Sequence, residues 1–218
     1  MPEETEKTGI KLDILRIAGA LIIAYVVGSF PSAYIVTRLR KGVDIREVGS
    51  RNLGAMNVFY KVGFWDGMAV LLADIGKGAL GVWVAEALGV NVAWQMVAGV
   101  FVVVGHNFPV FLNFKGGKGG AACIGILMYF MPWGVPVYLG FFLLILLFLR
   151  TPTISYSIAF IAFPFIAWLI NHSAEFVIYS LGLVLLPLAR YIPRLLEQRQ
   201  KGGSWKHVVV RKDLKDRL

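Results

Sequence analysis

The sequence consists largely of long apolar runs, each close to the length of about 20 residues that crosses a bilayer as a helix. The runs lie near residues 14–39, 65–88, 93–113, 120–132, 134–149, 153–170 and 175–189. Hydrophobic residues make up 57% of the chain, above the roughly 45–50% of soluble domains, and the mean hydropathy is +0.69. The sequence therefore predicts an all-α integral membrane protein with about seven transmembrane helices.

The fourth and fifth apolar runs are short, and the segment MPWGVP over 131–136 interrupts them. Because proline bends or ends a helix, one kinked helix through 120–149 is the main alternative to two helices. The segment GSFPS over 28–32 likewise predicts a kink within the first run.

Lysine and arginine are distributed unevenly among the connecting segments. With seven spans, the loop over 38–61, the lysines at 115 and 118, Arg150 and the segment after 190 share one side. The connections over 89–92 and 171–174 contain neither lysine nor arginine. Because positive charge collects on the cytoplasmic side, we expect an external N-terminus and a cytoplasmic C-terminus. The expected location is the plasma membrane.

The expected organisation is one multi-pass membrane domain over 1–190 and a basic cytoplasmic tail over 191–218. The tail supplies much of the formal net charge of +9, which suits anionic membrane lipids better than nucleic acid. A basic end that follows the positive-inside rule is the simplest interpretation. No cleavable signal peptide is expected, because the N-terminus is acidic and the first apolar run is long. The single cysteine, Cys123, excludes an intramolecular disulfide.

The segment over 105–120, GHNFPVFLNFKGGKGG, is unusually polar for its apolar surroundings. A lysine inside a bilayer costs roughly 2.5–3.5 kcal/mol on insertion scales, and irregular backbone persists there only inside protein or beside a wet cavity. Glycines that expose backbone N–H groups beside cations suit a phosphate ligand. The candidate phosphate-binding residues are Lys115, Gly116, Gly117, Lys118 and Gly119.

His106 and Asn107 precede this lysine–glycine segment on the third run. A lone histidine on an apolar helix is usually structural. His106 lies nine residues before Lys115, however, so both are expected at the cytoplasmic end, where they can converge on an anion. The sequence shows neither zinc-ligand spacing nor a Gly-x-Ser-x-Gly elbow. We therefore expect no metal and no cofactor.

Two further groups of polar residues are candidates for the same site. The first cytoplasmic loop contains VGSRNLGAMN over 48–57, where Ser50, Asn52, Gly54 and Asn57 offer hydrogen bonds and close backbone approach. An Asx or Ser turn that caps a helix is the alternative. In the second run, Asp74 and Lys77 are three residues apart and share a helix face. They form either a functional polar pair or a structural ion pair.

Three ordered motifs carry a resemblance to a known family: VGSRNLGAMN, LADIGKG over 72–78, and GHNFPVFLNFKGGKG over 105–119. Together they resemble the membrane-integral, acyl-phosphate-dependent glycerol-3-phosphate acyltransferases of bacteria, the PlsY family. The resemblance implies seven helices and a cytoplasmic site that moves an acyl chain from acyl phosphate to the 1-hydroxyl of sn-glycerol 3-phosphate. The implied products are lysophosphatidic acid and phosphate.

Acyl phosphate is already activated, so this reaction needs positioning and charge neutralisation more than a protein nucleophile. The resemblance implies that Ser50, Asn52 and Gly54 hold the acyl-phosphate head and that the two lysines neutralise phosphate. His106 and Asn107 would orient the carbonyl or the loop, and a substrate phosphate would accept the hydroxyl proton. The implied catalytic residues are Ser50, His106 and Lys118.

The sequence departs from the family pattern at positions expected to bind the acceptor. Arg51, Met56 and Tyr60 stand where the family has glycine, threonine and arginine. Arg51 or Lys61 are the candidate substitutes for the missing arginine. The family's Arg-x-Val-Ser becomes RTPTISYS from Arg150, so its serine is either Ser155 or absent, and a His with a nearby Asn is missing after the last run.

These departures leave two alternatives open. One is a related acyltransferase with another polyol-phosphate acceptor. The other is a non-catalytic membrane protein or anion transporter. A transporter typically has internal repeats, which the sequence does not show.

Overall fold

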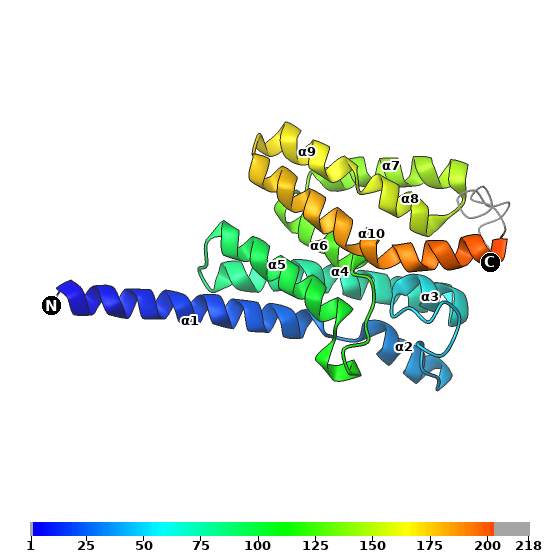
Figure 1. Cartoon of the computed structure of the whole chain (residues 1–218), viewed down its shortest axis with the longest axis horizontal. Coiled ribbons are helices and arrows are strands. Elements are labelled where there is room, and N and C mark those ends of the chain that lie inside the picture. The colour runs from blue at the N-terminus through cyan, green and yellow to red at the C-terminus, as the bar shows by residue number, and fades with distance from the viewer. Residues whose placement is uncertain (1, 203–218) are drawn as a thin grey trace. The chain divides into compact units, whose positions relative to one another are not determined.

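The computed structural model describes the backbone of residues 2–202. By its internal contacts the chain divides into two compact units, Met1–Tyr129 and Phe130–Leu218, and each is described by itself (Figure 1). Within the described residues the regular elements are all helices. This agrees with the predicted all-α class.

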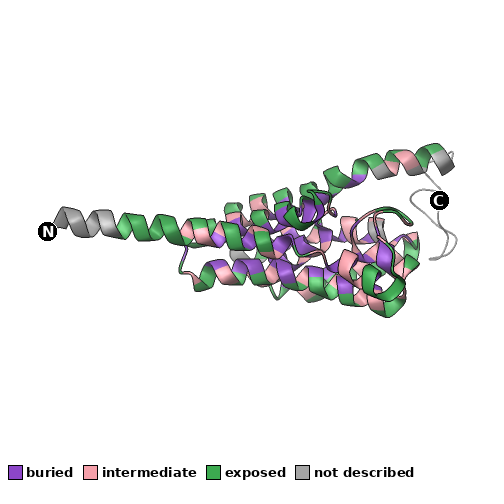
Figure 2. Cartoon of the chain, turned by 90° about the horizontal axis from the view of Figure 1, so that it is seen from below, coloured by how far each residue is buried: buried purple, intermediate pink, exposed green. Residues whose placement is uncertain are grey.

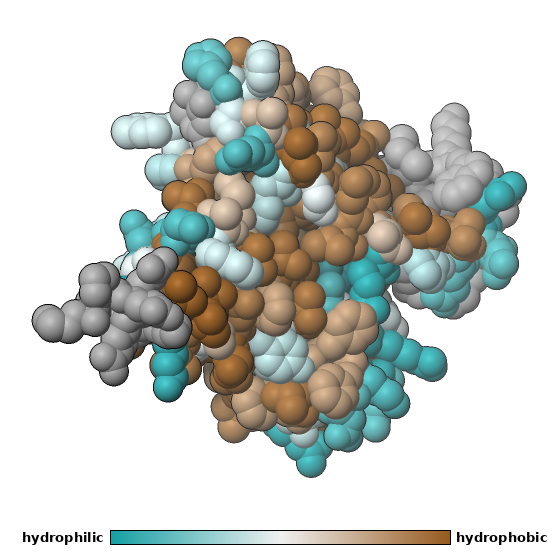
Figure 3. All heavy atoms as spheres, turned by 60° about the vertical axis from the view of Figure 1, so that its left-hand side comes forward, coloured by the Kyte–Doolittle hydropathy of each residue, from teal (hydrophilic) through white to brown (hydrophobic). Residues whose placement is uncertain are grey.

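Three helical stretches in the described part of the chain are long and apolar enough to cross a bilayer. They are Phe64–Ala87, Val92–Leu112 and Ala174–Glu197, and shorter apolar helices cover Gly120–Phe130, Gly134–Leu149 and Ile154–Leu169. Hydrophobic side chains cover much of the face shown in Figure 3. Such a surface suits lipid rather than water.

The first unit begins with α1 (Pro2–Gly28) and α2 (Ser32–Lys41), separated by the predicted interruption at Pro31. Pro31 cannot donate a backbone hydrogen bond, and the Ser29 hydroxyl donates to the Tyr25 carbonyl at 2.8 Å. Residues 9–16 of α1 are exposed and form part of the green stretch of this helix in Figure 2. Among the residues of α1 whose burial is described, Ala20 is the first that is buried. Gly42, with φ 70°, ends α2.

The remaining helices of the first unit are α3 (Ala55–Lys61), α4 (Phe64–Ala87), α5 (Val92–Asn107), the short 3-10 turn η1 (Val110–Leu112) and α6 (Gly120–Phe130). Helix α5 is capped by Asn91, whose side chain accepts a hydrogen bond from the Trp94 N–H at 3.1 Å. Helix α1 packs against α4 and α5. A methyl group on Gly105 would overlap the Tyr25 carbonyl, so α5 and α1 approach more closely than larger residues permit.

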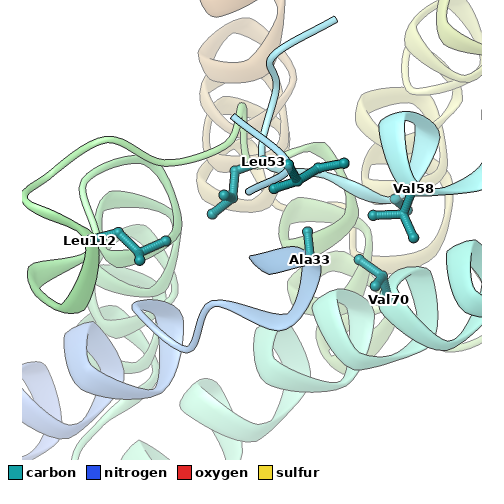
Figure 4. Packing of buried hydrophobic residues seen from close by; sticks show 7 residues of the cluster. Ala33, Leu53, Val58, Val70 and Leu112 are labelled. Atoms are coloured by element: carbon teal, nitrogen blue, oxygen red, sulfur yellow. The ribbon is translucent and has the colours of Figure 1, made fainter. Parts of the chain in front are cut away.

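A buried apolar cluster at one end of this unit holds its loops together. Figure 4 shows Leu53 and Val58 near Ala33 of α2 and Val70 of α4, with Leu112 of η1 pointing toward them. Ile45, in the loop after α2, belongs to the same cluster and is fully buried. The cluster therefore joins the first loop to the segment that precedes the two lysines.

The second unit contains α7 (Gly134–Leu149), α8 (Pro152–Ala159), α9 (Ala162–Asn171) and α10 (Ala174–Gly202). Residues 131–133 separate α6 from α7, so two helices replace the single kinked helix of the alternative. Tyr138 packs on Phe160 and Phe163, with ring centroids 5.7 and 5.2 Å away. Helix α10 continues into the predicted basic tail as far as Gly202, and residues 203–218 lie outside the described part.

Candidate active site

Asn57 of α3 determines the shape of the first loop. Its side-chain oxygen accepts a hydrogen bond from the Ser50 N–H at 3.0 Å. Its amide nitrogen lies 3.1 Å from the Ile45 carbonyl, 3.0 Å from that of Val48 and 3.2 Å from that of Asn52. The Asn57 side chain is 2% exposed. These contacts turn the loop around one buried amide and leave Ser50 at the exposed apex.

Left-handed backbone conformations flank Ser50 on both sides. Gly49 has φ 60° and Arg51 has φ 58°, a region that costs a non-glycine residue more than glycine. Arg51 occupies the position where the resembled family has glycine. The backbone at this position therefore keeps a conformation that glycine adopts more readily than arginine. The side chain of Lys61 lies across Gly49, because a Cβ there would be 2.8 Å from the lysine Cε.

The lysine–glycine segment is attached to the end of α5. The Gly116 N–H donates to the Asn107 carbonyl at 3.2 Å, and the Gly117 N–H donates to the His106 carbonyl at 3.0 Å. These two N–H groups, which the sequence suggested for phosphate, therefore satisfy carbonyls at the helix end. Lys115 is exposed and Lys118 is half-buried. Because α6 begins at Gly120, the second lysine adjoins a helix N-terminus, which favours anions.

The first loop and the lysine–glycine segment meet at Gly117. A Cβ on this buried glycine would overlap His106 Nε2 and would lie 2.5 Å from the Leu53 carbonyl oxygen. Only a residue without a side chain fits between them. The contact brings together two motifs that are about 60 residues apart in the sequence.

A buried ion pair lies behind His106. Asp74 Oδ1 is 2.9 Å from Lys77 Nζ and accepts a hydrogen bond from the Ser32 hydroxyl at 2.6 Å. His106 Nδ1 is 3.8 Å from the same oxygen. Lys77 also donates to the Phe30 carbonyl at 3.1 Å, just before Pro31. The predicted pair is thus present and connects the α1–α2 break to α4 and α5.

The side chains of Asn107 and Ser155 differ in whether they already have a hydrogen-bond partner. The Asn107 side chain is 5% exposed, and its oxygen has no hydrogen-bond partner among the described residues. It lies beside Gly119, whose Cβ would be 3.1 Å from that oxygen. Ser155 belongs to the second unit, is fully buried, and donates its hydroxyl to the Thr151 carbonyl at 2.9 Å.

The sequence-based candidates omit two residues that contact this region. Ser32 binds Asp74 across 42 positions of sequence, a pairing with no local signal. Arg46 binds Asp44 and reaches the Leu112 carbonyl at 3.3 Å. The spacing Asp-x-Arg in a loop was the available signal for the first of these contacts, but not for the second.

Comparison with known proteins supports the resemblance across nearly the whole chain. Residues 18–198 match the family model described as glycerol-3-phosphate acyltransferase. The chain belongs to this family. It is therefore an acyltransferase of phospholipid synthesis and an integral, multi-pass membrane protein, and the predicted family and activity are confirmed.

Individual members of the glycerol-3-phosphate acyltransferase family show how close the similarity is. Glycerol-3-phosphate acyltransferase 2 of Dehalococcoides mccartyi (strain ATCC BAA-2266 / KCTC 15142 / 195) is 50% identical over 207 residues, covering 94% of this chain and 99% of the relative. The enzyme of Endomicrobium trichonymphae is 38% identical over 183 residues, covering 83% and 92%.

A solved structure has the same fold. The crystal structure of PlsY (YgiH), an integral membrane glycerol 3-phosphate acyltransferase, in its glycerol 3-phosphate form, matches with a TM-score of 0.76 and 29% identity, covering 86% of this chain and 92% of that chain. Its lysophosphatidic acid form matches with a TM-score of 0.74 and 29% identity over the same shares.

Proposed function

We propose that this acyltransferase takes a fatty acyl chain from acyl phosphate and places it on the 1-hydroxyl of sn-glycerol 3-phosphate, forming lysophosphatidic acid and phosphate. The observation that carries the proposal is the meeting of the two motif loops at Gly117, next to His106. Their exposed residues, Ser50 and Lys115, supply a hydroxyl and a cation. Both substrates carry a phosphate that such groups recognise.

The proposed reaction is a direct displacement at the acyl carbon. The 1-hydroxyl oxygen of glycerol 3-phosphate attacks the carbonyl carbon, and the bond from that carbon to the phosphate oxygen breaks. The departing phosphate takes the hydroxyl proton. Because the donor is activated, the protein contributes by holding two anions together and by screening their repulsion.

Residues of the two loops take the substrate-binding roles in this proposal. Ser50, Asn52 and Gly54 hold the head of acyl phosphate, and Lys115 and Lys118 neutralise phosphate charge, with Gly119 allowing close approach. The Asn107 oxygen is buried without a partner in the described part of the chain and lies beside Gly119, so we assign Asn107 to orienting the loop. Asn57, Gly116 and Gly117 contribute by shaping the loops.

His106 acts through the loop rather than on the reacting atoms. It is 5% exposed, and its two ring nitrogens face Asp74 on one side and Gly117 on the other. His106 contacts the lysine–glycine segment at Gly117, and the Asp74–Lys77 pair lies on the other side of its ring. Preorganised groups of this kind lower the cost of reaching the transition state.

Lys61 is the better substitute for the arginine that Tyr60 replaces. Its side chain lies across Gly49, directly beside Ser50, and it follows Asn57 by one helical turn on the same face of α3. We assign it to the acceptor phosphate. Arg51 is exposed and has no contact that directs it toward the loop junction in the described structure.

The seven-span topology, with an external N-terminus and a cytoplasmic site, is part of the proposal. So are the plasma-membrane location and the division into a membrane domain over 1–190 and a basic tail over 191–218 that meets anionic lipids. The distribution of lysine and arginine supports this orientation. In this orientation the proposed site faces the cytoplasm.

Lys118→Ala tests the proposed chemistry. Removing a charge-assisted contact worth about 1.5–3 kcal/mol should lower kcat/KM about 10- to 100-fold, with unchanged membrane insertion. Lys41→Ala, which removes an exposed lysine at the end of α2, is the matched control and should keep wild-type turnover. Wild-type turnover by Lys118→Ala would remove the phosphate role from this lysine.

A further inference from the structure

Arg46 lies in the first loop, but its side chain reaches beyond it. The guanidinium nitrogens bind Asp44 bidentately, with Nε 3.0 Å from both carboxylate oxygens and Nη2 2.6 Å from Oδ2. Its Nη1 donates to the Leu112 carbonyl of η1 at 3.3 Å. The guanidinium carbon lies 5.5 Å from the ring centroid of Tyr34 in α2, within the range of a cation–π contact.

The carbonyl that Arg46 reaches is also bound by the lysine–glycine segment. The Lys115 N–H donates to the Leu112 carbonyl at 3.2 Å. One oxygen atom therefore accepts hydrogen bonds from the loop that carries Ser50 and from the first candidate phosphate-binding lysine. Arg46 precedes Ser50 by four residues, and Leu112 precedes Lys115 by three. The shared carbonyl is therefore close in sequence to both candidate ligand-binding residues.

We propose that Arg46 is a positioning residue that sets the separation between the Ser50 loop and the start of the lysine–glycine segment. This inference rests on the proposed function, in which those two loops hold the reacting groups. The planar fork of arginine binds Asp44 and the Leu112 carbonyl at the same time, and a lysine ammonium does not have this geometry. Asp44 holds the guanidinium group in place, and the guanidinium group holds the two loops at a set separation.

We expect the apolar cluster to keep the first unit folded when Arg46 is replaced. Ile45 and Leu112 are both buried in it, next to the polar contact. Loss of Arg46 should therefore loosen the alignment of the loops without unfolding the unit. Misplacement by about 1 Å costs up to about 100-fold in rate, whereas all the proposed substrate-binding side chains are kept, so kcat should change more than KM.

The test compares Arg46→Gln and Arg46→Lys with Arg40→Gln in the detergent-solubilised enzyme. Arg40 pairs with Asp66 at 2.9 Å but is 67% exposed, so its replacement removes the same charge without touching the second loop. We expect kcat to fall about 10- to 100-fold in both Arg46 variants, with KM for each substrate within about threefold, and no change in Arg40→Gln.

Asp44→Asn and the double variant show whether the two residues act together. If Asp44 works only by orienting Arg46, the double variant Asp44→Asn with Arg46→Gln should be no slower than Arg46→Gln alone. If the fold-reductions in kcat of the two single variants multiply in the double variant, Asp44 does not act through Arg46, and that part of the proposal is wrong.

Hydrogen exchange provides a readout independent of turnover. Amides 115–117 should exchange at least about fivefold faster in Arg46→Gln than in wild type or Arg40→Gln, because opening lowers local stability. Unchanged exchange together with unchanged kcat would overturn the inference. If the wild type makes no lysophosphatidic acid, the proposed function fails, and the exchange result still decides whether Arg46 couples the loops.

Discussion

At the scale of single residues, Gly117 occupies the contact on which the site depends. Gly117→Ala would place a methyl group onto His106 Nε2 and against the Leu53 carbonyl. We expect the loops to separate and kcat/KM to fall at least about tenfold. Gly140→Ala is the control, because nothing lies within 4 Å of that position, and it should retain full activity. Steady-state kinetics of both variants decide the matter, and a fully active Gly117→Ala would contradict the described junction.

Lys61 provides the second residue-scale prediction. If it binds the acceptor phosphate, Lys61→Gln should raise KM for glycerol 3-phosphate about 10- to 100-fold, the value of a charge-assisted hydrogen bond. KM for acyl phosphate should stay the same. Adding arginine through Tyr60→Arg in the Lys61→Gln background should recover part of the affinity. A Lys61→Gln enzyme with wild-type acceptor KM would show that another group holds this phosphate.

Residue-scale prediction from the sequence succeeded where spacing along a helix determines proximity. Asp74 and Lys77 are three residues apart on α4 and form the expected ion pair. The partners from other helices, Ser32 and His106, depend on how α2, α4 and α5 pack, which local spacing does not contain. The N–H groups of Gly116 and Gly117 were expected at a ligand, but the carbonyls at the end of α5 bind them.

At the scale of elements, the Asp44–Arg46 pair makes the first loop sensitive to pH. Hydrogen bonds from the Arg46 side chain hold the pKa of the Asp44 carboxyl below its usual value. Because the pKa is lower in the folded state, the pair stabilises the fold fully above the unfolded value of about 4. This stabilisation is lost as the pH falls through the lowered, folded pKa.

Asp44→Asn should therefore be less stable than wild type at pH 7, and the difference should shrink when the pH is lowered toward about 3. Thermal unfolding midpoints of the detergent-solubilised proteins across this range measure the effect. A difference that is constant with pH, or that grows as the pH falls, would show that Asp44 does not act as a paired carboxylate.

Apolar runs predicted where helices lie, but not every interruption. The break before α2 and the separation of α6 from α7 both coincide with proline in the sequence. The break between α8 and α9 at residues 160–161 divides the run predicted over 153–170, and it precedes Pro164, which cannot donate a hydrogen bond to the Phe160 carbonyl. Helix α3 and the turn η1 are short, and tertiary contacts such as those of Val58 and Leu112 hold them in place.

At the scale of the whole molecule, the proposed orientation has a direct test. Cys123 is fully buried and can be replaced by serine, after which single cysteines are placed at exposed positions. A membrane-impermeant maleimide should label His172→Cys in intact cells, and should label Gln200→Cys only after permeabilisation, because the basic end is expected in the cytoplasm. The reverse pattern would invert the topology and place the site outside.

The central claim is the transfer of an acyl chain from acyl phosphate to glycerol 3-phosphate. The most direct measurement gives the purified, detergent-solubilised protein palmitoyl phosphate with and without glycerol 3-phosphate, and follows phosphate release and the lipid product by mass spectrometry. We expect lysophosphatidic acid and phosphate only when both substrates are present. Absence of lysophosphatidic acid with both substrates present would contradict the claim, and acyl-phosphate binding without that product would indicate a different acceptor.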